Sequence, residues 1–508
     1  MSTEQIDRSP NRRIAVSAAL ALTAGWAVAA GWWTPRGPLT SQEAIASIIV
    51  SLAVGGIAGF LVGSRWTILV TPLVFATVFE VVRLGVDGPM VDGVHTSFYG
   101  ALALITGRGF QAGLTLIPLA LGSALGAGGW RARHGRMSSR WSRVVGRGGA
   151  VIVGLALLVL MIGLARPATT APITGPDGQP LAGSVAELTT ITAGGHELPL
   201  MIRGTSTDNP ILLFLPGGPG GSEFGAMRRH LPALEEHFTV VTWDPRGAGT
   251  AYDELDPVST VTVAGHVGDT IAVTDYLRER FGQDGIYLLG QSWGSTLGVM
   301  AVQQRPELYR AFIGTGQMVS QLATDRIFYQ DALAWARRIG DTGLVEQLQT
   351  AGPPPYHAMF PYETALSHEQ DVYSYDHSAN SEGSGQMSEN LLVPEYTLID
   401  QIHVIGAFMD SFAALYPQLQ DVDFRKTATS FDLPVFFVQG AHEADGRARP
   451  FAQWYPMIEA PIKDLAVLQT SGHRPLWEQP DEFAQLDKQG GSSPLARGAA
   501  CFLRRWAR

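Results

Sequence analysis

The pentapeptide GQSWG at positions 290–294 is the first feature of this sequence whose residues could carry out chemistry. It matches the pattern G-x-S-x-G, in which a serine occupies a tight turn between a strand and a helix. The apolar run Ile286–Leu289 precedes it and a helical pattern, Thr296–Gln304, follows it, which is the context that the pattern requires. The pentapeptide therefore predicts a nucleophilic serine, Ser292, exposed at the turn.

A serine hydroxyl is a weak nucleophile, so it needs a histidine as base and a carboxylate that orients the histidine. In this architecture the three follow in the order serine, acid, histidine. His473 comes directly after the last strand-like run, Leu465–Leu468. The acid should follow the preceding run, Val435–Val438, where Glu443 and Asp445 both qualify. We expect Glu443, because it lies closer to the end of the strand.

The glycine-rich run LPGGPGG at positions 215–221 ends an apolar run, Ile211–Leu215. A turn of this kind can direct a backbone N–H toward an oxyanion, and we expect Gly218 to supply one donor and Trp293, directly after the nucleophile, the other. A phosphate site is the alternative, but the run lacks the G-K-[ST] ending of such loops. This chemistry needs no cofactor and no metal, and the single cysteine, Cys501, excludes a cysteine-rich metal site.

The second half of the chain alternates apolar runs with helical patterns, which predicts a mostly parallel sheet with helices on both faces. Its expected strands are Ser184–Thr192, Glu197–Arg203, Ile211–Leu215, Phe238–Trp243, Ile286–Leu289, Ala311–Ile313, Val435–Val438 and Leu465–Leu468. Between about residues 319 and 429 the alternation stops, and this segment is too long for a loop. We interpret it as a helical cap over the catalytic edge. The predicted domains are a transmembrane region 1–166, a linker 167–183, a hydrolase core 184–318, the cap 319–429 and a second part of the core 430–508.

Four segments together carry a family resemblance: GGPGG, TWDPRGAGTAY from Thr242 to Tyr252, GQSWGSTLG from Gly290 to Gly298, and SGHRPLWEQP around His473. They resemble the α/β-hydrolases of the proline iminopeptidase group of serine peptidases. The resemblance implies an α/β-hydrolase fold with a helical cap and a triad of Ser292, an acid and His473. It also implies the release of single N-terminal residues, often proline, from short peptides.

The sequence departs from the family pattern in three ways. Pro216 replaces the histidine that usually opens the HGGPG motif, and Glu443 replaces the usual aspartate. The membrane-like N-terminal region is not part of the usual enzyme. The family binds the free amine of its substrate with cap carboxylates, for which this cap offers Glu363, Glu382, Glu389, Glu395 and Asp410.

The first 166 residues differ in composition from the rest. The whole chain is 46% hydrophobic and only 16% charged, where roughly 25% charged is typical. Residues 1–166 hold 14 arginines and 6 acidic residues, whereas residues 167–508 hold 22 basic and 40 acidic residues. A membrane-spanning helix needs about 20 mostly apolar residues. The five expected spans are Ile14–Trp33, Ala44–Gly63, Trp66–Leu84, Gln111–Gly129 and Ala150–Ala165.

Two details of this region leave alternatives open. The apolar run Phe98–Ile105 predicts either a re-entrant segment or part of a longer, interrupted helix. The triplet Ala27-Val28-Ala29 resembles a signal-peptide cleavage site, which would not change the final topology. Glu80 and Arg83 lie three residues apart within the third expected span, and we expect them to pair with each other rather than to form a transport site.

Arginines in the short loops predict the orientation in the membrane. Arg8, Arg12 and Arg13 precede the first span, and residues 130–149 carry six arginines. Five spans then place the N-terminus in the cytoplasm and the C-terminal domain outside it. Because the basic charge lies between apolar runs, we expect a lipid bilayer as its partner and no nucleic acid.

The sequence as a whole predicts a serine hydrolase anchored in the plasma membrane, which acts on a small peptide or a small amide or ester. Another ester or amide hydrolase with the same triad is the first alternative. A non-catalytic, hydrolase-like binding domain is an alternative of another class. An epoxide or haloalkane hydrolase would carry aspartate in place of Ser292, and a transporter would need more polar groups within its spans.

Overall fold

The computed structural model describes residues 10–135, 140–373 and 391–485. Glu382, Glu389 and Cys501 lie outside these described residues. The chain divides into two compact units, the first formed by Met1–Pro167 with Thr397–Gly406 and the second by Ala168–Tyr396 with Ala407–Arg508. The predicted cap segment 319–429 is therefore shared between the units, which the sequence did not indicate.

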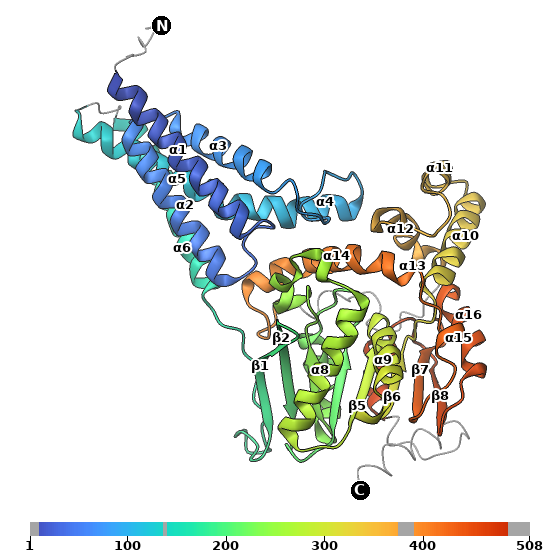
Figure 1. Ribbon diagram of the computed structural model, residues 1–508. Helices are drawn as coiled ribbons and strands as arrows, with labels where there is room; N and C mark the ends of the chain where they lie inside the picture. Colours follow the sequence, from blue (N-terminus) through green and yellow to red (C-terminus); the bar gives the residue numbers. More distant parts are fainter. Residues whose placement is uncertain (1–9, 136–139, 374–390, 486–508) are drawn as a thin grey trace. The chain divides into compact units, whose positions relative to one another are not determined.

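The first unit is a bundle of helices that pack side by side (Figure 1). Its helices are α1 (Pro10–Trp33), α2 (Ser41–Val62), α3 (Thr67–Val82), α4 (Phe98–Leu104), α5 (Phe110–Arg133) and α6 (Arg140–Leu164). A single π-helical turn, Ile105–Gly109, joins α4 to α5. The run Phe98–Ile105 is thus the start of a longer, interrupted helix, the second of the two possibilities that the sequence left open.

Glycines let α2 and α5 approach each other closely. A Cβ atom on Gly59 would lie 2.3 Å from the Ser123 carbonyl oxygen, and one on Gly126 would lie 2.0 Å from the Gly56 carbonyl oxygen. Gly55 on α2 and Gly122 on α5 meet the facing backbone in the same way. Each helix thus presents two glycines four residues apart, the small-residue packing that is typical of helices in a bilayer.

Four helices of the N-terminal region are long and apolar enough to cross a membrane, namely Arg12–Trp33, Ser41–Val62, Phe98–Arg133 and Val144–Leu164. The third predicted span, Trp66–Leu84, is shorter than expected, because α3 has 16 residues and ends at Val82. At 1.5 Å per residue it is about 24 Å long, against a hydrocarbon core of about 30 Å. Within the described residues, α14 (Leu398–Leu419) is a fifth helix of sufficient length and apolarity, and the sequence analysis assigned it to the cap.

Charged side chains gather at the two ends of this bundle. At one end, Arg131 Nη1 lies 3.5 Å from the carbonyl oxygen of Gly63, close to the loop that carries Arg65. At the other end, Arg83 Nη1 lies 3.4 Å from the carbonyl oxygen of Pro35. Arg83 also donates from Nε to Glu80 at 3.0 Å, so the predicted pairing is confirmed. Because α3 begins near Gly63 and ends near Pro35, it runs from one end of the bundle to the other despite its length.

The N-terminal part of α14 belongs to this first unit. Ile399 is buried with Ala44, Ile48 and Leu164. His403 Nε2 lies 2.9 Å from the carbonyl oxygen of Pro38, and its ring meets Phe110 edge to face. These contacts explain why residues 397–406 separate from the rest of the predicted cap.

The second unit is built on a sheet that, among the described residues, has eight strands in the order β1-β2-β4-β3-β5-β6-β7-β8. The strands are β1 (Val185–Ala193), β2 (His196–Gly204), β3 (Ile211–Leu215), β4 (Thr239–Trp243), β5 (Ile286–Gln291), β6 (Tyr309–Thr315), β7 (Val435–Gly440) and β8 (Lys463–Leu468). β1 pairs with β2, and β2 with β4, in antiparallel fashion, while all other pairs are parallel. The predicted mostly parallel sheet is confirmed, and each expected strand is present with ends that differ from the prediction by at most two residues.

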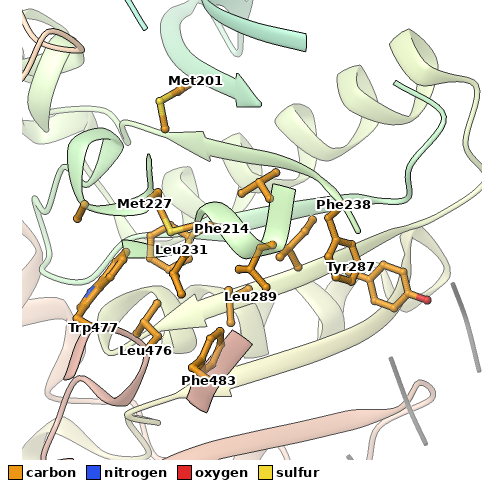
Figure 2. Packing of buried hydrophobic residues seen from close by; sticks show 14 of the residues in the cluster. Met201, Phe214, Met227, Leu231, Phe238, Tyr287, Leu289, Leu476, Trp477 and Phe483 are labelled. Carbon is orange, nitrogen blue, oxygen red and sulfur yellow. The ribbon is translucent and has the colours of Figure 1, made fainter. Parts of the chain in front are cut away.

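Helices cover both faces of this sheet. They are α7 (Phe224–His230), α8 (Val263–Phe281), α9 (Trp293–Gln304), α15 (Phe424–Thr427), α16 (Asp445–Trp454), α17 (Pro475–Glu478) and α18 (Pro480–Gln485). Leu212 and Phe214 of β3 point to the face that α7, α17 and α18 cover, where Trp477 meets Phe214 edge to face (Figure 2). On the opposite face, α9 packs so closely that a Cβ on Gly298 would lie 2.3 Å from the Phe312 ring. Alternate residues of each buried strand thus serve the two faces.

The segment that follows β6 is helical, as predicted for the cap. Its helices before the undescribed residues are α10 (Gln321–Ile339), α11 (Thr342–Ala351), α12 (Met359–Leu366) and α13 (Glu369–Val372). Ala332 and Ala336 of α10, Leu344 and Leu348 of α11 and Ala365 of α12 form a small apolar core of their own.

Candidate active site

Ser292 follows β5 directly and is the residue that precedes α9. Its backbone has φ 53° and ψ −116°, a conformation that a side chain other than glycine rarely adopts. Glycines on either side make the turn possible, since a Cβ on Gly290 would lie 2.4 Å from the Gly294 carbonyl oxygen and one on Gly294 would lie 2.0 Å from that of Leu215. The turn leaves the serine partly exposed beyond the carboxyl end of the sheet.

His473 faces Ser292 from the loop after β8. Its Nε2 lies 2.8 Å from Ser292 Oγ, a hydrogen-bonding distance. Leu476 and Trp477 of α17, which follow this loop, anchor it because they are fully buried in the core shown in Figure 2. Glu478 also holds the loop, because its carboxylate accepts hydrogen bonds from the backbone N–H groups of Gly472 and Arg474.

Glu443 completes the arrangement from the loop after β7. Its Oε2 lies 2.7 Å from His473 Nδ1, while its Oε1 accepts from Arg447 Nε at 2.8 Å and from the Ala444 N–H at 2.9 Å. Burial alone would raise the pKa of this carboxyl, but the charges of Arg447 and His473 outweigh burial and lower it to about 2. Glu443 is therefore ionised at neutral pH.

Asp445, the alternative acid, lies elsewhere. It begins α16, its side chain is half exposed, and it pairs with Arg449 one helical turn later at 2.5 Å. The structure thus brings together Ser292, His473 and Glu443 and does not bring Asp445 to them.

The two expected oxyanion donors flank the serine. Trp293 is the first residue of α9, so its N–H has no acceptor within the helix. Gly218 follows the end of β3, and a Cβ on the adjacent Gly217 would lie 2.3 Å from Gln291 Oε1, which shows how closely this loop passes the turn. Among the described residues, no acceptor is hydrogen-bonded to the Gly218 N–H.

A buried ion pair connects the glycine-rich loop with the histidine loop. Arg474, next to His473, lies 3.3 Å from Glu223 Oε1, and both side chains are less than 10% exposed. Burial raises the pKa of Glu223, and the charge of Arg474 and the backbone N–H of Gly217 counteract this rise. The pair therefore links the glycine-rich loop that carries Gly218 to the loop that carries His473.

The segment WDPRGAGTAY at positions 243–252 serves to hold the loop after β4. Asp244 Oδ2 accepts from the Thr250 N–H at 2.9 Å, and its Oδ1 accepts from the Tyr396 hydroxyl at 3.1 Å. Arg246 forms a buried ion pair with Asp269 of α8 at 2.7 Å. Asp244 and Arg246 of this motif therefore have structural partners that hold the loop in place.

The cap carboxylates singled out in the sequence fall into different environments. Glu395 is buried and ion-paired with Arg228, and Asp410 is buried and accepts from the Tyr252 hydroxyl at 2.8 Å. Glu363 is buried on α12. Sequence reasoning missed Asp325 of α10, a buried carboxylate that accepts from Tyr416, Gln420 and Gln321. Burial raises the pKa of Asp325 to about 6 despite these hydrogen bonds.

Sequence reasoning also missed Arg447 and its second partner, Glu369 of α13. A signal for Arg447 was present, because it follows Glu443 by four residues at the start of a helix, the spacing of an ion pair. No such signal existed for Glu369, which is 78 residues away from Arg447 in the chain.

Comparison with known proteins agrees with this architecture. The alpha/beta hydrolase fold family matches residues 210–480. The probable aminopeptidase YbaC of Bacillus subtilis is 30% identical over 306 residues, which cover 59% of this chain and 95% of that protein. A probable proline iminopeptidase of Leptolyngbya boryana is 29% identical over 134 residues, which cover 26% of this chain and 39% of that protein.

Among solved structures, the proline iminopeptidase-related protein of Thermus thermophilus is 20% identical with a TM-score of 0.44, and the match covers 63% of this chain and 99% of that one. The glycine-rich run, the serine turn and the histidine loop all fall within the family match at residues 210–480. The chain belongs to the α/β-hydrolase fold family, within its proline iminopeptidase group.

Proposed function

We propose that this protein is a serine hydrolase in which Ser292 is the nucleophile, His473 the general base and Glu443 the residue that orients the histidine. The observation that carries the proposal is the unbroken series of hydrogen-bonding distances, 2.8 Å from Ser292 Oγ to His473 Nε2 and 2.7 Å from His473 Nδ1 to Glu443 Oε2. This arrangement lets the histidine take the serine proton while its other nitrogen stays protonated.

The proposed reaction assigns one step to each of these groups. Ser292 Oγ attacks the carbonyl carbon of the substrate while its proton passes to His473 Nε2. The carbonyl oxygen becomes an oxyanion, to which the N–H groups of Gly218 and Trp293 donate. Collapse of this intermediate breaks the bond to the leaving amine, which takes the proton from His473. Water then attacks the acyl-enzyme with His473 again as base, which releases the acid and restores Ser292.

A fluorophosphonate probe tests the nucleophile without knowledge of the substrate. Ser292 Oγ would form a bond to phosphorus, fluoride would leave, and the serine proton would pass to His473. We expect the full-length protein in detergent to be labelled and Ser292→Ala to remain unlabelled at the same thermal midpoint. Ser295→Ala is the matched control and should still be labelled, because the Ser295 hydroxyl already donates to the Ser292 carbonyl oxygen at 2.6 Å. Labelling that persists in Ser292→Ala would assign the nucleophile elsewhere.

We propose that the enzyme is an aminopeptidase. Its substrates would be short peptides, from which it releases N-terminal residues. The support is the similarity to a probable aminopeptidase over 95% of that protein's length and to proline iminopeptidases over shorter segments. The test uses aminoacyl nitroanilides in pairs, one with a free N-terminus and one acetylated. A preference of about tenfold or more for the free amine fits the proposal, since a buried polar group left without its partner costs about 1–3 kcal/mol. Equal rates, or a preference for simple esters, would favour another ester or amide hydrolase.

We propose further that the first unit spans a membrane five times and that the hydrolase unit is outside the cytoplasm. The support is that α3 runs between the bundle ends near Gly63 and Pro35, so that α1, α2, α3, α5 and α6 alternate in direction. The arginine-rich loops then lie at the end near Gly63, as the charge rule requires for the cytoplasmic side.

Reporter fusions test this orientation. A periplasmic or surface reporter after Arg508 should be active, and the same reporter within residues 136–139 should be inactive. If α3 did not cross the membrane, the C-terminal fusion would be active only with a cytoplasmic reporter, because an even number of spans would remain.

A further inference from the structure

Arg447 lies between two carboxylates, one from the proposed triad and one from the cap. Its Nε donates to Glu443 Oε1 at 2.8 Å, and its Nη1 and Nη2 both donate to the Glu369 carboxylate, Nη1 at 3.2 Å. The guanidinium also lies over the Phe328 ring of α10, 5.0 Å from its centroid. The side chains of Arg447, Glu443 and Glu369 are only 7%, 5% and 12% exposed, so water screens their charges weakly.

We propose that Arg447 and Glu369 are positioning residues of the catalytic triad, where Arg447 fixes the Glu443 carboxylate and Glu369 restores the negative charge that Arg447 cancels. This inference rests on the proposed function of Ser292, His473 and Glu443. It makes a segment of the cap, α13, part of the machinery that activates the serine.

The geometric part of the argument concerns the length of the acid. Glutamate has one more rotatable bond than the aspartate usual at this position, so its carboxylate is harder to hold in one place. Arg447 Nε and the Ala444 N–H fix Oε1, which leaves Oε2 directed at His473 Nδ1. An arginine is suited to this task because its planar fork bonds one carboxylate through Nε and another through its Nη atoms.

The electrostatic part concerns the charge that His473 meets. The task of the triad acid is to stabilise the imidazolium that forms during the reaction. A Glu443–Arg447 pair alone has no net charge, and it would stabilise the imidazolium poorly. With Glu369 the group carries one net negative charge, which becomes zero when His473 takes the serine proton. Glu369 therefore favours the reacting state although it does not contact His473.

Other titratable groups lie around this cluster. Glu478 acts on both His473 and Glu443, and burial raises its pKa. Tyr362 of α12 and Tyr373 after α13 face Glu369, and burial raises the pKa of each far enough to keep it neutral. Asp445 acts on Tyr373 and pairs with Arg449, while Arg474 pairs with Glu223. Since all of these groups stay unchanged in the variants at Arg447 and Glu369 below, they contribute equally to each of those pH profiles.

The test measures the rate of fluorophosphonate labelling of the full-length protein against pH. Glu369→Gln should move the acid limb of the profile to lower pH by about 0.5–1 unit, because a negative charge near the histidine is lost. Arg447→Met should move the limb to higher pH and lower the plateau rate by about a hundredfold, since Glu443 loses its fixed position. The double variant should have the limb of the wild type with the lowered plateau.

Two further variants separate charge from geometry. Arg447→Lys keeps the charge and loses the fork, so the limb should stay in place while the plateau falls by about tenfold. The exposed pair on the same helix, Asp445→Asn with Arg449→Met, is the matched control and should leave both limb and plateau unchanged. If Arg447→Met does not fold, Glu369→Gln and Arg447→Lys still decide the question.

The inference would be overturned if the acid limbs of Glu369→Gln and Arg447→Met moved in the same direction, or if the limb of Glu369→Gln did not move. The cluster would then be only a structural contact. The proposed function fails separately, when labelling does not depend on Ser292 at all. A profile that depends on Ser292 but not on Glu369 would therefore reject the positioning role and keep the serine hydrolase.

Discussion

The two units of this protein place their charged residues in opposite ways. In the helical unit, residues 14–35, 44–64, 109–130 and 148–165 contain no charged residue. Two charged residues lie at the C-terminal end of α3, Glu80 in its last turn and Arg83 directly after it. In the hydrolase unit, buried ion pairs lie beside the sheet, namely Arg203–Glu235, Arg246–Asp269, Arg447–Glu443 and Arg474–Glu223. Helices without charged residues suit a low-dielectric surrounding such as a bilayer. Buried charges require a protein interior that supplies an oppositely charged partner for each of them.

Glycine also has different roles in the two units. On α2 and α5 it brings two helices together, as at Gly59 and Gly126, and it therefore contributes to stability. At Gly290 and Gly294 it allows the turn that leaves Ser292 partly exposed. The comparison teaches that glycine supports helix packing in one unit and the geometry of the serine turn in the other, and the predictions below test the packing and the site separately.

The largest effect is expected from Ser292→Ala, which should lower hydrolysis by at least about 10⁴-fold, because the remaining oxyanion donors and binding give only residual catalysis. The thermal midpoint in detergent should stay within the error of the wild-type value. A variant that loses activity and stability together would mean that the serine turn is also needed for folding.

Glu443→Gln should lower activity by about 10³- to 10⁴-fold, because an amide neither stabilises the imidazolium nor fixes the correct tautomer. Asp445→Asn should stay within about twofold of the wild type, since its side chain is half exposed and any effect at a surface ion pair is small. Steady-state kinetics on the best nitroanilide compares the two. The reverse ranking would assign the orienting role to Asp445.

Gly126→Leu should destabilise the helical unit by about 1–3 kcal/mol, because the added side chain must force α5 away from α2. Gly128→Leu on the same helix is the matched control, since a Cβ there meets no atom within 4 Å. Thermal unfolding in detergent micelles checks the difference, and fluorophosphonate labelling below the midpoint should be the same in both variants. Equal midpoints would contradict the close packing of α2 and α5.

The last prediction concerns the pH dependence of stability. The pKa of Glu443 is lowered in the folded protein to about 2, so its contribution is present above its ordinary pKa of 4.5 and is lost as the pH falls toward 2. Between pH 7 and pH 3 the wild type should lose about 2 kcal/mol more than Glu443→Gln. Parallel unfolding curves for the two proteins would show that this carboxyl does not contribute through its charge.

Local patterns were sufficient to predict much of the catalytic unit. The turn at Ser292 was predictable because a turn of this kind needs glycine on both sides, and the place of His473 because it lies in the loop after the last strand of the sheet. Strands such as β3, buried on both faces, are short continuous apolar runs, and their ends were predicted to within a few residues. The apolar helices α1 and α2 were equally clear, since an uninterrupted run of about 20 apolar residues is typical of a membrane-spanning helix.

Other features depended on residues that are distant in sequence. Phe98–Ile105 and Gln111–Gly129 look like separate runs in the sequence because Arg108 interrupts their apolarity, yet a π-helical turn joins them. The first part of α14 was assigned to the cap, because its apolar pattern does not reveal that Ile399 and His403 pack against the first unit. Composition describes what a helix can bury but not which partner covers it.

The sequence by itself predicted the serine turn, the histidine loop, the order of the strands along the chain and the apolar helices, because each depends on residues that are neighbours in sequence. Only the tertiary structure placed Glu443, and not Asp445, beside His473, since two residues so close in sequence differ in the direction that the start of α16 gives them. It alone brought Glu369 to Arg447, because a contact between residues 78 apart depends on how the cap folds. The turn that positions Ser292 depends on residues next to it in sequence, whereas the charge around His473 depends on how distant elements of the chain pack together.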